Sequence, residues 1–134
     1  MEQVGRCEIK EMQRSCETLD PALPDSCREL STHVKTVEAL VISSHRVVAY
    51  TAVQFEDPKA AADLWREYML FCEDALNCLR NAKEKFPYCA AVNAYDVTLD
   101  YWESAKERFH ENSQDAEWQS KTPSTLSPGQ SGKP

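Results

Sequence analysis

The sequence predicts an all-α fold, an antiparallel helical bundle of three long helices plus a short N-terminal helix. Gly occurs only 3 times in 134 residues, which is too rarely for the many tight turns of an all-β fold. Three long stretches place apolar or small residues at alternating steps of four and three, which keeps them on one face of a helix. The breaks between these stretches are short, so consecutive long helices are expected to lie antiparallel.

A proline-containing break separates the short helix from the first long one. The short helix is predicted over residues 2–19, and Pro21 and Pro24 interrupt the chain after it. Residues 26–29 have the S-x-x-E form of a capping box and predict the start of the first long helix. Its stripe consists of Leu30, Val34, Val37, Val41, Ser44, Val48, Thr51 and Phe55. A strand over residues 47–55 is the alternative because valine is abundant there, but strict apolar–polar alternation is absent.

The second and third long helices are divided by Pro87. Asp57 and Pro58 predict the start of the second long helix, as an N-cap acid followed by proline at the first helical position. Its predicted stripe is Ala61, Trp65, Tyr68, Cys72, Ala75, Leu79, Ala82 and Phe86. Three more apolar residues widen this stripe: Leu64, Phe71 and Leu76. The third helix has the stripe Val92, Tyr95, Leu99, Trp102 and Phe109, with Lys106 or the adjacent Ala105 between the last two.

The folded domain is predicted to span residues 1–111. From Asn112 the composition shifts to Ser, Pro, Gly, Gln and Thr, which bury too little apolar surface to become ordered. Residues 112–134 are therefore predicted to form a disordered polar tail. Trp118 lies in this tail without an evident core partner, and it either packs back onto the bundle or anchors another protein.

Charge and hydropathy exclude several classes of partner. The chain has 22 acidic and 15 basic residues, a net charge of −7, which opposes both nucleic-acid phosphates and anionic membrane surfaces. No segment reaches the roughly 20 apolar residues that span a bilayer, and residues 1–10 contain no apolar signal core. We therefore expect a cytoplasmic protein that binds neither nucleic acid nor membranes.

In the cytoplasm the six cysteines are expected to be free thiols. The alternative is an oxidising compartment, where Cys16 with Cys27 and Cys78 with Cys89 could each staple a turn. No pair has the CxxC spacing of zinc ribbons or redox motifs.

A series of acids on the third long helix is the one pattern that suggests chemistry. These candidate metal ligands are Asp96, Asp100, Glu103, Glu107 and His110. Acids one turn apart can share a divalent cation, and Glu107-x-x-His110 has the spacing of carboxylate-bridged di-metal bundles. Such a site needs inward-facing acids and a second Glu-x-x-His, which the sequence lacks, so a solvated acidic face is the competing interpretation. His45, beside the first long stripe, is expected to be an ordinary, partly buried histidine.

We expect a protein–protein interaction or assembly module, with no catalytic residue and no cofactor assigned. The wide apolar face around Leu64, Phe71 and Leu76 predicts self-association, most simply as a two-fold homodimer. The competing possibility is that the short N-terminal helix covers this face within one chain. A basic partner protein is a further possibility, and a helical-bundle enzyme or ligand binder with a carboxylate-bound divalent metal is the alternative function.

Overall fold

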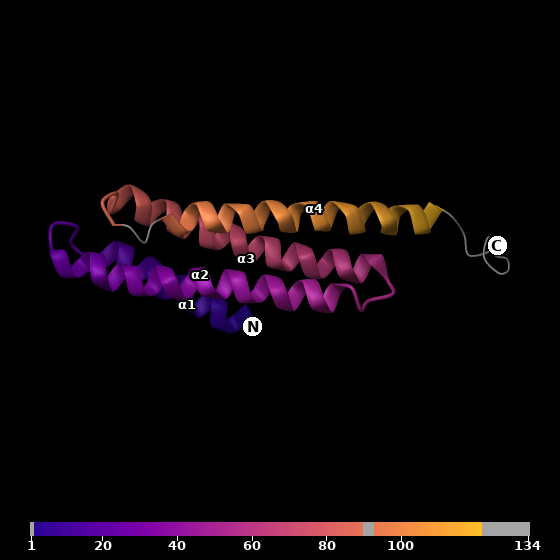
Figure 1. The fold of residues 1–134 in the computed structure, drawn as a ribbon, viewed down its shortest axis with the longest axis horizontal. Coiled ribbons are helices and arrows are strands. Elements are labelled where there is room, and N and C mark those ends of the chain that lie inside the picture. Colours follow the sequence, from indigo (N-terminus) through magenta and orange to yellow (C-terminus); the bar gives the residue numbers. More distant parts are fainter. Residues whose placement is uncertain (1, 90–92, 122–134) are drawn as a thin grey trace.

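The computed structural model describes residues 2–89 and 93–121, and within them the chain forms four α-helices and no strand. These are α1 (Glu2–Thr18), α2 (Pro24–Ala52), α3 (Pro58–Lys85) and α4 (Ala94–Lys121). In Figure 1 the three long helices run side by side in alternating directions, with α1 packed beside α2. The predicted all-α bundle of three long helices and a short N-terminal helix is confirmed. No helix in the described ranges is both long and apolar enough to cross a bilayer.

The valine-rich stripe of α2 forms one side of the core. Val34, Val37 and Val41 have no exposed surface, and the buried face continues to Ala52. The strand alternative is therefore wrong for residues 47–52. The predicted capping box is also wrong, because α2 already begins at Pro24 and Ser26 is buried in its first turn.

Helices α2 and α3 each contact all three other helices, and the contact of α3 with α4 is the most extensive. Asp57 accepts a hydrogen bond from the backbone amide of Lys59 at 3.0 Å, which confirms the predicted N-cap. Trp65, Tyr68 and Leu79 are almost completely buried, and the Tyr68 hydroxyl donates to the carbonyl oxygen of Val41 at 2.8 Å. This bond ties the middle of α3 to the middle of α2.

Helix α4 differs from its prediction in phase and in length. Its buried residues are Ala94, Thr98 and Ala105. The large residues of the predicted stripe lie one position away and are only partly buried within the described residues, and of the pair Lys106 or Ala105 it is Ala105 that is buried. The helix also continues to Lys121, so the predicted domain boundary after residue 111 falls inside α4. Residues 122–134, the rest of the predicted tail, lie outside the described residues, as does Val92.

A disulfide joins the beginning of α2 to the segment after α3. Cys27 and Cys89 are bonded, with their Cα atoms 5.8 Å apart, which is an ordinary separation for a disulfide. The prediction of six free thiols is therefore wrong, and neither turn staple considered from the sequence forms. The antiparallel course of α2 and α3 places the start of one beside the end of the other, and this brings the two thiols together. The free cysteines are Cys7, Cys16, Cys72 and Cys78.

Candidate functional site

The candidate metal ligands of α4 lie on the outside of the bundle. All five side chains, Asp96, Asp100, Glu103, Glu107 and His110, are exposed. Within residues 2–89 and 93–121, no group of three or more such side chains is placed to hold a metal ion. The metal hypothesis required these acids to face inward, and the structure places them on a solvated face.

Of the three residues that predicted self-association, Phe71 is covered by α1. Phe71 is only 7% exposed, and a Cβ atom built on Gly5 would lie 2.5 Å from its ring. Arg6 of α1 forms an ion pair with Asp74, one turn further along α3. Leu64 and Leu76 are partly buried. Phe71 therefore belongs to the core of its own chain, and the N-terminal helix is its cover.

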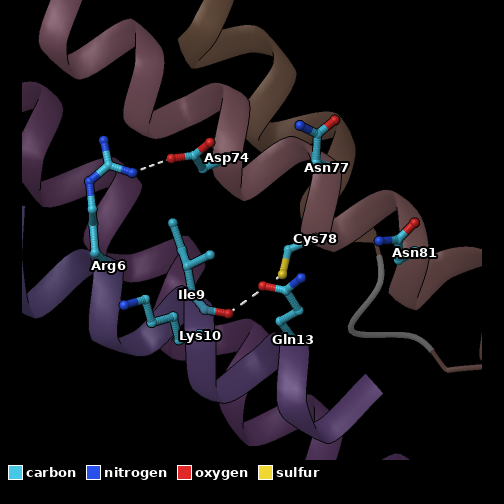
Figure 2. Close-up of a pocket in the computed structure, with 8 residues that line it drawn as sticks. All are labelled: Arg6, Ile9, Lys10, Gln13, Asp74, Asn77, Cys78 and Asn81. Carbon is cyan, nitrogen blue, oxygen red and sulfur yellow. Dashed lines mark hydrogen bonds and ion pairs between the residues drawn. The ribbon is translucent and has the colours of Figure 1, made fainter. Parts of the chain in front are cut away.

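A polar groove follows the seam between α1 and α3 (Figure 2). It consists of two adjoining cavities of about 280 and 300 Å³, which share Gln13, Cys78 and Asn81 in their walls. Figure 2 shows Cys78 directed from α3 toward α1, where its thiol donates to the carbonyl oxygen of Ile9 at 3.5 Å. At the other end of the seam, the ammonium group of Lys85 donates to the carbonyl oxygen of Cys16.

The two buried thiols in this groove are poor nucleophiles. Burial raises the pKa of Cys78 to about 11, and it also raises the pKa of Cys16, against the opposing effect of Lys85. Because the thiolate is the reactive form, both cysteines are protonated and unreactive near neutral pH. The α1–α3 groove therefore contains no activated nucleophile.

A second hollow, which has exposed aromatic side chains in its walls, lies at the opposite end of the bundle from the α1–α2 turn. Figure 1 shows the C-terminal end of α4 beside the connection between α2 and α3. The cavity between them measures about 530 Å³. We call it the Trp118 groove, and it is lined by Ala52, Val53, Phe55, Glu56, Pro58, Ala61, Asn112, Asp115, Trp118 and Gln119.

Large apolar side chains at the Trp118 groove are exposed to solvent. Trp118 is 65% exposed, Val53 75% and Phe55 42%. Phe55 was predicted to end the buried stripe of α2, but the helix stops at Ala52 and the chain turns there. Two further apolar residues on α2, Val47 and Tyr50, are more than half exposed within two turns of Val53. This concentration of exposed apolar surface has no counterpart in the polar α1–α3 groove.

The charges that line the Trp118 groove are both negative. Glu56 and Asp115 are exposed, and neither has an ion-pair partner within the described part of the chain. The cations nearest to them in sequence are already paired. Lys121 contacts Glu117 at 2.9 Å, and Lys59 contacts Asp63 at 3.1 Å. The groove therefore combines exposed aromatic side chains with unneutralised acidic charge.

His45 is the centre of an aromatic cluster that joins α2, α3 and α4. Its ring lies 5.4 Å from Trp65, 5.6 Å from Tyr68 and 5.0 Å from Tyr101, measured between ring centroids. Burial, and to a lesser degree the charge of Arg108, lowers the pKa of His45. The sequence-based expectation of a partly buried histidine is confirmed.

The comparisons with known proteins add no functional information. No family model matches the chain, no curated protein is detectably similar in sequence, and no solved structure is detectably similar in fold. Trp118 was recognised as a candidate from the sequence. The groove was missed because residues 112–121 were predicted to be disordered, so that Trp118 was not placed beside the α2–α3 connection.

Proposed function

We propose that this protein is a protein-interaction module that binds another polypeptide chain through the Trp118 groove. The observation that supports the proposal is an exposed tryptophan that lines a hollow with an exposed phenylalanine in its wall. Tryptophan is among the residues most enriched at the energetic centres of protein interfaces. Exposed apolar residues that cluster in this way are typical of interaction sites on soluble domains.

Self-association is the form of this function that the sequence favoured. A two-fold dimer through Phe71 would have to displace α1, because Phe71 is already buried beneath Gly5. If the chain self-associates, the Trp118 groove is therefore a better candidate for the dimer interface than the surface around Phe71. If the wild type is a dimer by light scattering at micromolar concentrations and Trp118→Ala is a monomer, a second copy occupies the groove; a monomeric wild type leaves the groove to a different polypeptide.

Crosslinking from single positions on α4 tests the function without assuming a partner. A photoreactive phenylalanine analogue is placed at position 118, and at Glu103 as a matched control that is also exposed on α4. We expect position 118, but not position 103, to crosslink to a polypeptide in the cells that produce the protein. A product of twice the chain mass identifies self-association. Equal crosslinking from both positions, or none from position 118, contradicts the proposed function.

A further inference from the structure

The electrostatics of the Trp118 groove indicate the kind of partner that fits it. Glu56 lies at the α2–α3 connection and Asp115 on α4, so acidic charge comes from both walls. Both carboxylates are exposed and unpaired in the described ranges, and no cation lines the groove. A bound segment with a cation near each acid would form two new ion pairs at the rim while its apolar residues cover Trp118 and Phe55.

A second copy of this chain lacks the complementary charge. Two copies together bring the net charge of −7 on each chain into proximity, and a two-fold contact through this groove places the same acids on both sides. Like charges across an interface disfavour binding, whereas opposite charges raise the association rate and select the partner. Electrostatics therefore favours a basic partner over self-association.

The dimensions of the groove suit a peptide segment. Its volume of about 530 Å³ lies within the range of roughly 300–1,000 Å³ found for small-ligand pockets, which leaves space for a few apolar side chains. Its walls come from the end of α2, the short α2–α3 connection, the start of α3 and the end of α4, which together form an open hollow. An amphipathic helix inserts apolar residues from one face into such a hollow and keeps its charged residues at the rim.

We infer that the partner of the Trp118 groove is a basic amphipathic helical segment, with lysine or arginine beside the apolar side chains that cover Trp118 and Phe55. This inference rests on the proposed function, because it specifies the chemistry of the chain that binds there. The exposed aromatic side chains provide the anchor, and Glu56 and Asp115 provide the preference for a basic segment.

Synthetic peptides test the inference with the purified full chain. The probe is a fluorescently labelled amphipathic helix of leucine and lysine. It is compared with a leucine–glutamate helix of equal length and with a scrambled leucine–lysine peptide that has no apolar face. Binding is followed by fluorescence anisotropy. We expect the leucine–lysine helix to bind most tightly, the scrambled peptide to bind about tenfold more weakly, and the affinity to fall with added salt.

Variants of the protein separate the anchor from the charges. Trp118→Ala should weaken binding of the leucine–lysine helix about 30-fold, as expected for loss of an interface hot spot. The double variant E56Q/D115N should weaken it about fivefold, the effect of two exposed ion pairs. The matched control D100N/E103Q removes two exposed acids from α4 outside the groove and should change affinity by less than about twofold.

The possible results distinguish the inference from the function on which it rests. Equal affinity for the lysine and glutamate helices, or equal losses in E56Q/D115N and D100N/E103Q, overturns the basic partner. If Trp118→Ala still weakens binding in that case, the interaction function stands. If no peptide binds, the inference fails, and the crosslinking from position 118 decides the proposed function independently.

Discussion

Replacing Gly5 by alanine should disturb the contact between α1 and α3, and shortening Phe71 should remove the disturbance. A Cβ atom at position 5 would lie 2.5 Å from Cε1 and 2.9 Å from Cζ of Phe71. Such distances are too short for carbon atoms, so the ring or the helix must move. The ring is 7% exposed and lies beside Tyr68, with the two ring centroids 6.5 Å apart, so it has little free space.

The magnitude follows from two opposing contributions. Overpacking of a well-packed core costs about 1–3 kcal/mol. Alanine is favoured over glycine in a helix by about 1 kcal/mol, which offsets part of this loss. We therefore expect Gly5→Ala to lower the free energy of unfolding by about 0–2 kcal/mol in the wild-type background. With Phe71→Ala the clash disappears, and the same substitution should raise the free energy of unfolding by about 1 kcal/mol.

A double-mutant cycle of Gly5→Ala and Phe71→Ala isolates the contact between the two residues. The gain in helix propensity from alanine at position 5 is the same with or without Phe71, so it cancels. Urea unfolding of the wild type, both single variants and the double variant should give a coupling energy of about 1–3 kcal/mol. Phe109→Ala is the control partner, because Phe109 lies on α4, which does not contact α1. That cycle should be additive within about 0.5 kcal/mol. The structural reasoning is refuted if Gly5→Ala stabilises the wild type fully and shows no coupling to Phe71.

Three further predictions concern the disulfide, the histidine and the exposed tryptophan. Replacing Cys27 and Cys89 by serine should lower the free energy of unfolding by about 2–4 kcal/mol, because the bond closes a loop with a sequence separation of 62 residues; equal urea midpoints would contradict this. Burial lowers the pKa of His45 in the folded chain. The contribution of His45 to stability is therefore complete above the pKa of the unfolded state, about 6.5, and it is lost as the pH falls through the lower pKa of the folded state. The stability difference between the wild type and His45→Gln should therefore shrink between about pH 7.5 and pH 5. A constant difference would show that the pKa of His45 is the same in the folded and unfolded states. Trp118→Ala should change the free energy of unfolding by less than about 0.5 kcal/mol because Trp118 is largely exposed, and a larger loss by urea unfolding would show that it packs on the bundle.

The helices that the sequence predicted most accurately are those whose buried face is uniformly apolar. In α2 the residues at steps of three and four are mainly valines, and the predicted stripe is buried from Leu30 to Val48, whereas Thr51 is only partly buried and Phe55 is exposed. In α3 a proline at the first helical position and an N-cap aspartate mark the start without ambiguity. Periodicity succeeds in these helices because hydrophobicity and burial coincide along most of the face.

Helix α4 shows where a hydrophobic pattern selects the wrong face. Its contact with α3 is the most extensive in the bundle, and the residues buried there are Ala94, Thr98 and Ala105. Small side chains allow two helices to approach closely, whereas the larger Tyr95 and Trp102 are only partly buried. A pattern that ranks residues by hydrophobicity selects the large neighbours and misses the small residues at the contact.

The end of α4 and the Trp118 groove were missed for a related reason. Residues 112–121 are polar, and composition alone predicted disorder. Local interactions instead continue the helix, since Asn112 donates to the carbonyl oxygen of Arg108 at 2.8 Å and Lys121 pairs with Glu117 at 2.9 Å. This extra helical length brings Trp118 to the α2–α3 connection, so the groove depends on tertiary structure that the sequence pattern did not contain.

The disulfide changes the argument about the compartment in which the chain folds. The expectation of a cytoplasmic location rested partly on six free thiols, and Cys27 and Cys89 are not free. Disulfides persist mainly in oxidising compartments. Cys89 is only 2% exposed, whereas Cys27 is partly exposed, so the bond is buried on the side of Cys89 only. The bond holds the segment after α3 at the start of α2, and its presence removes the six free thiols from the argument for a cytoplasmic location.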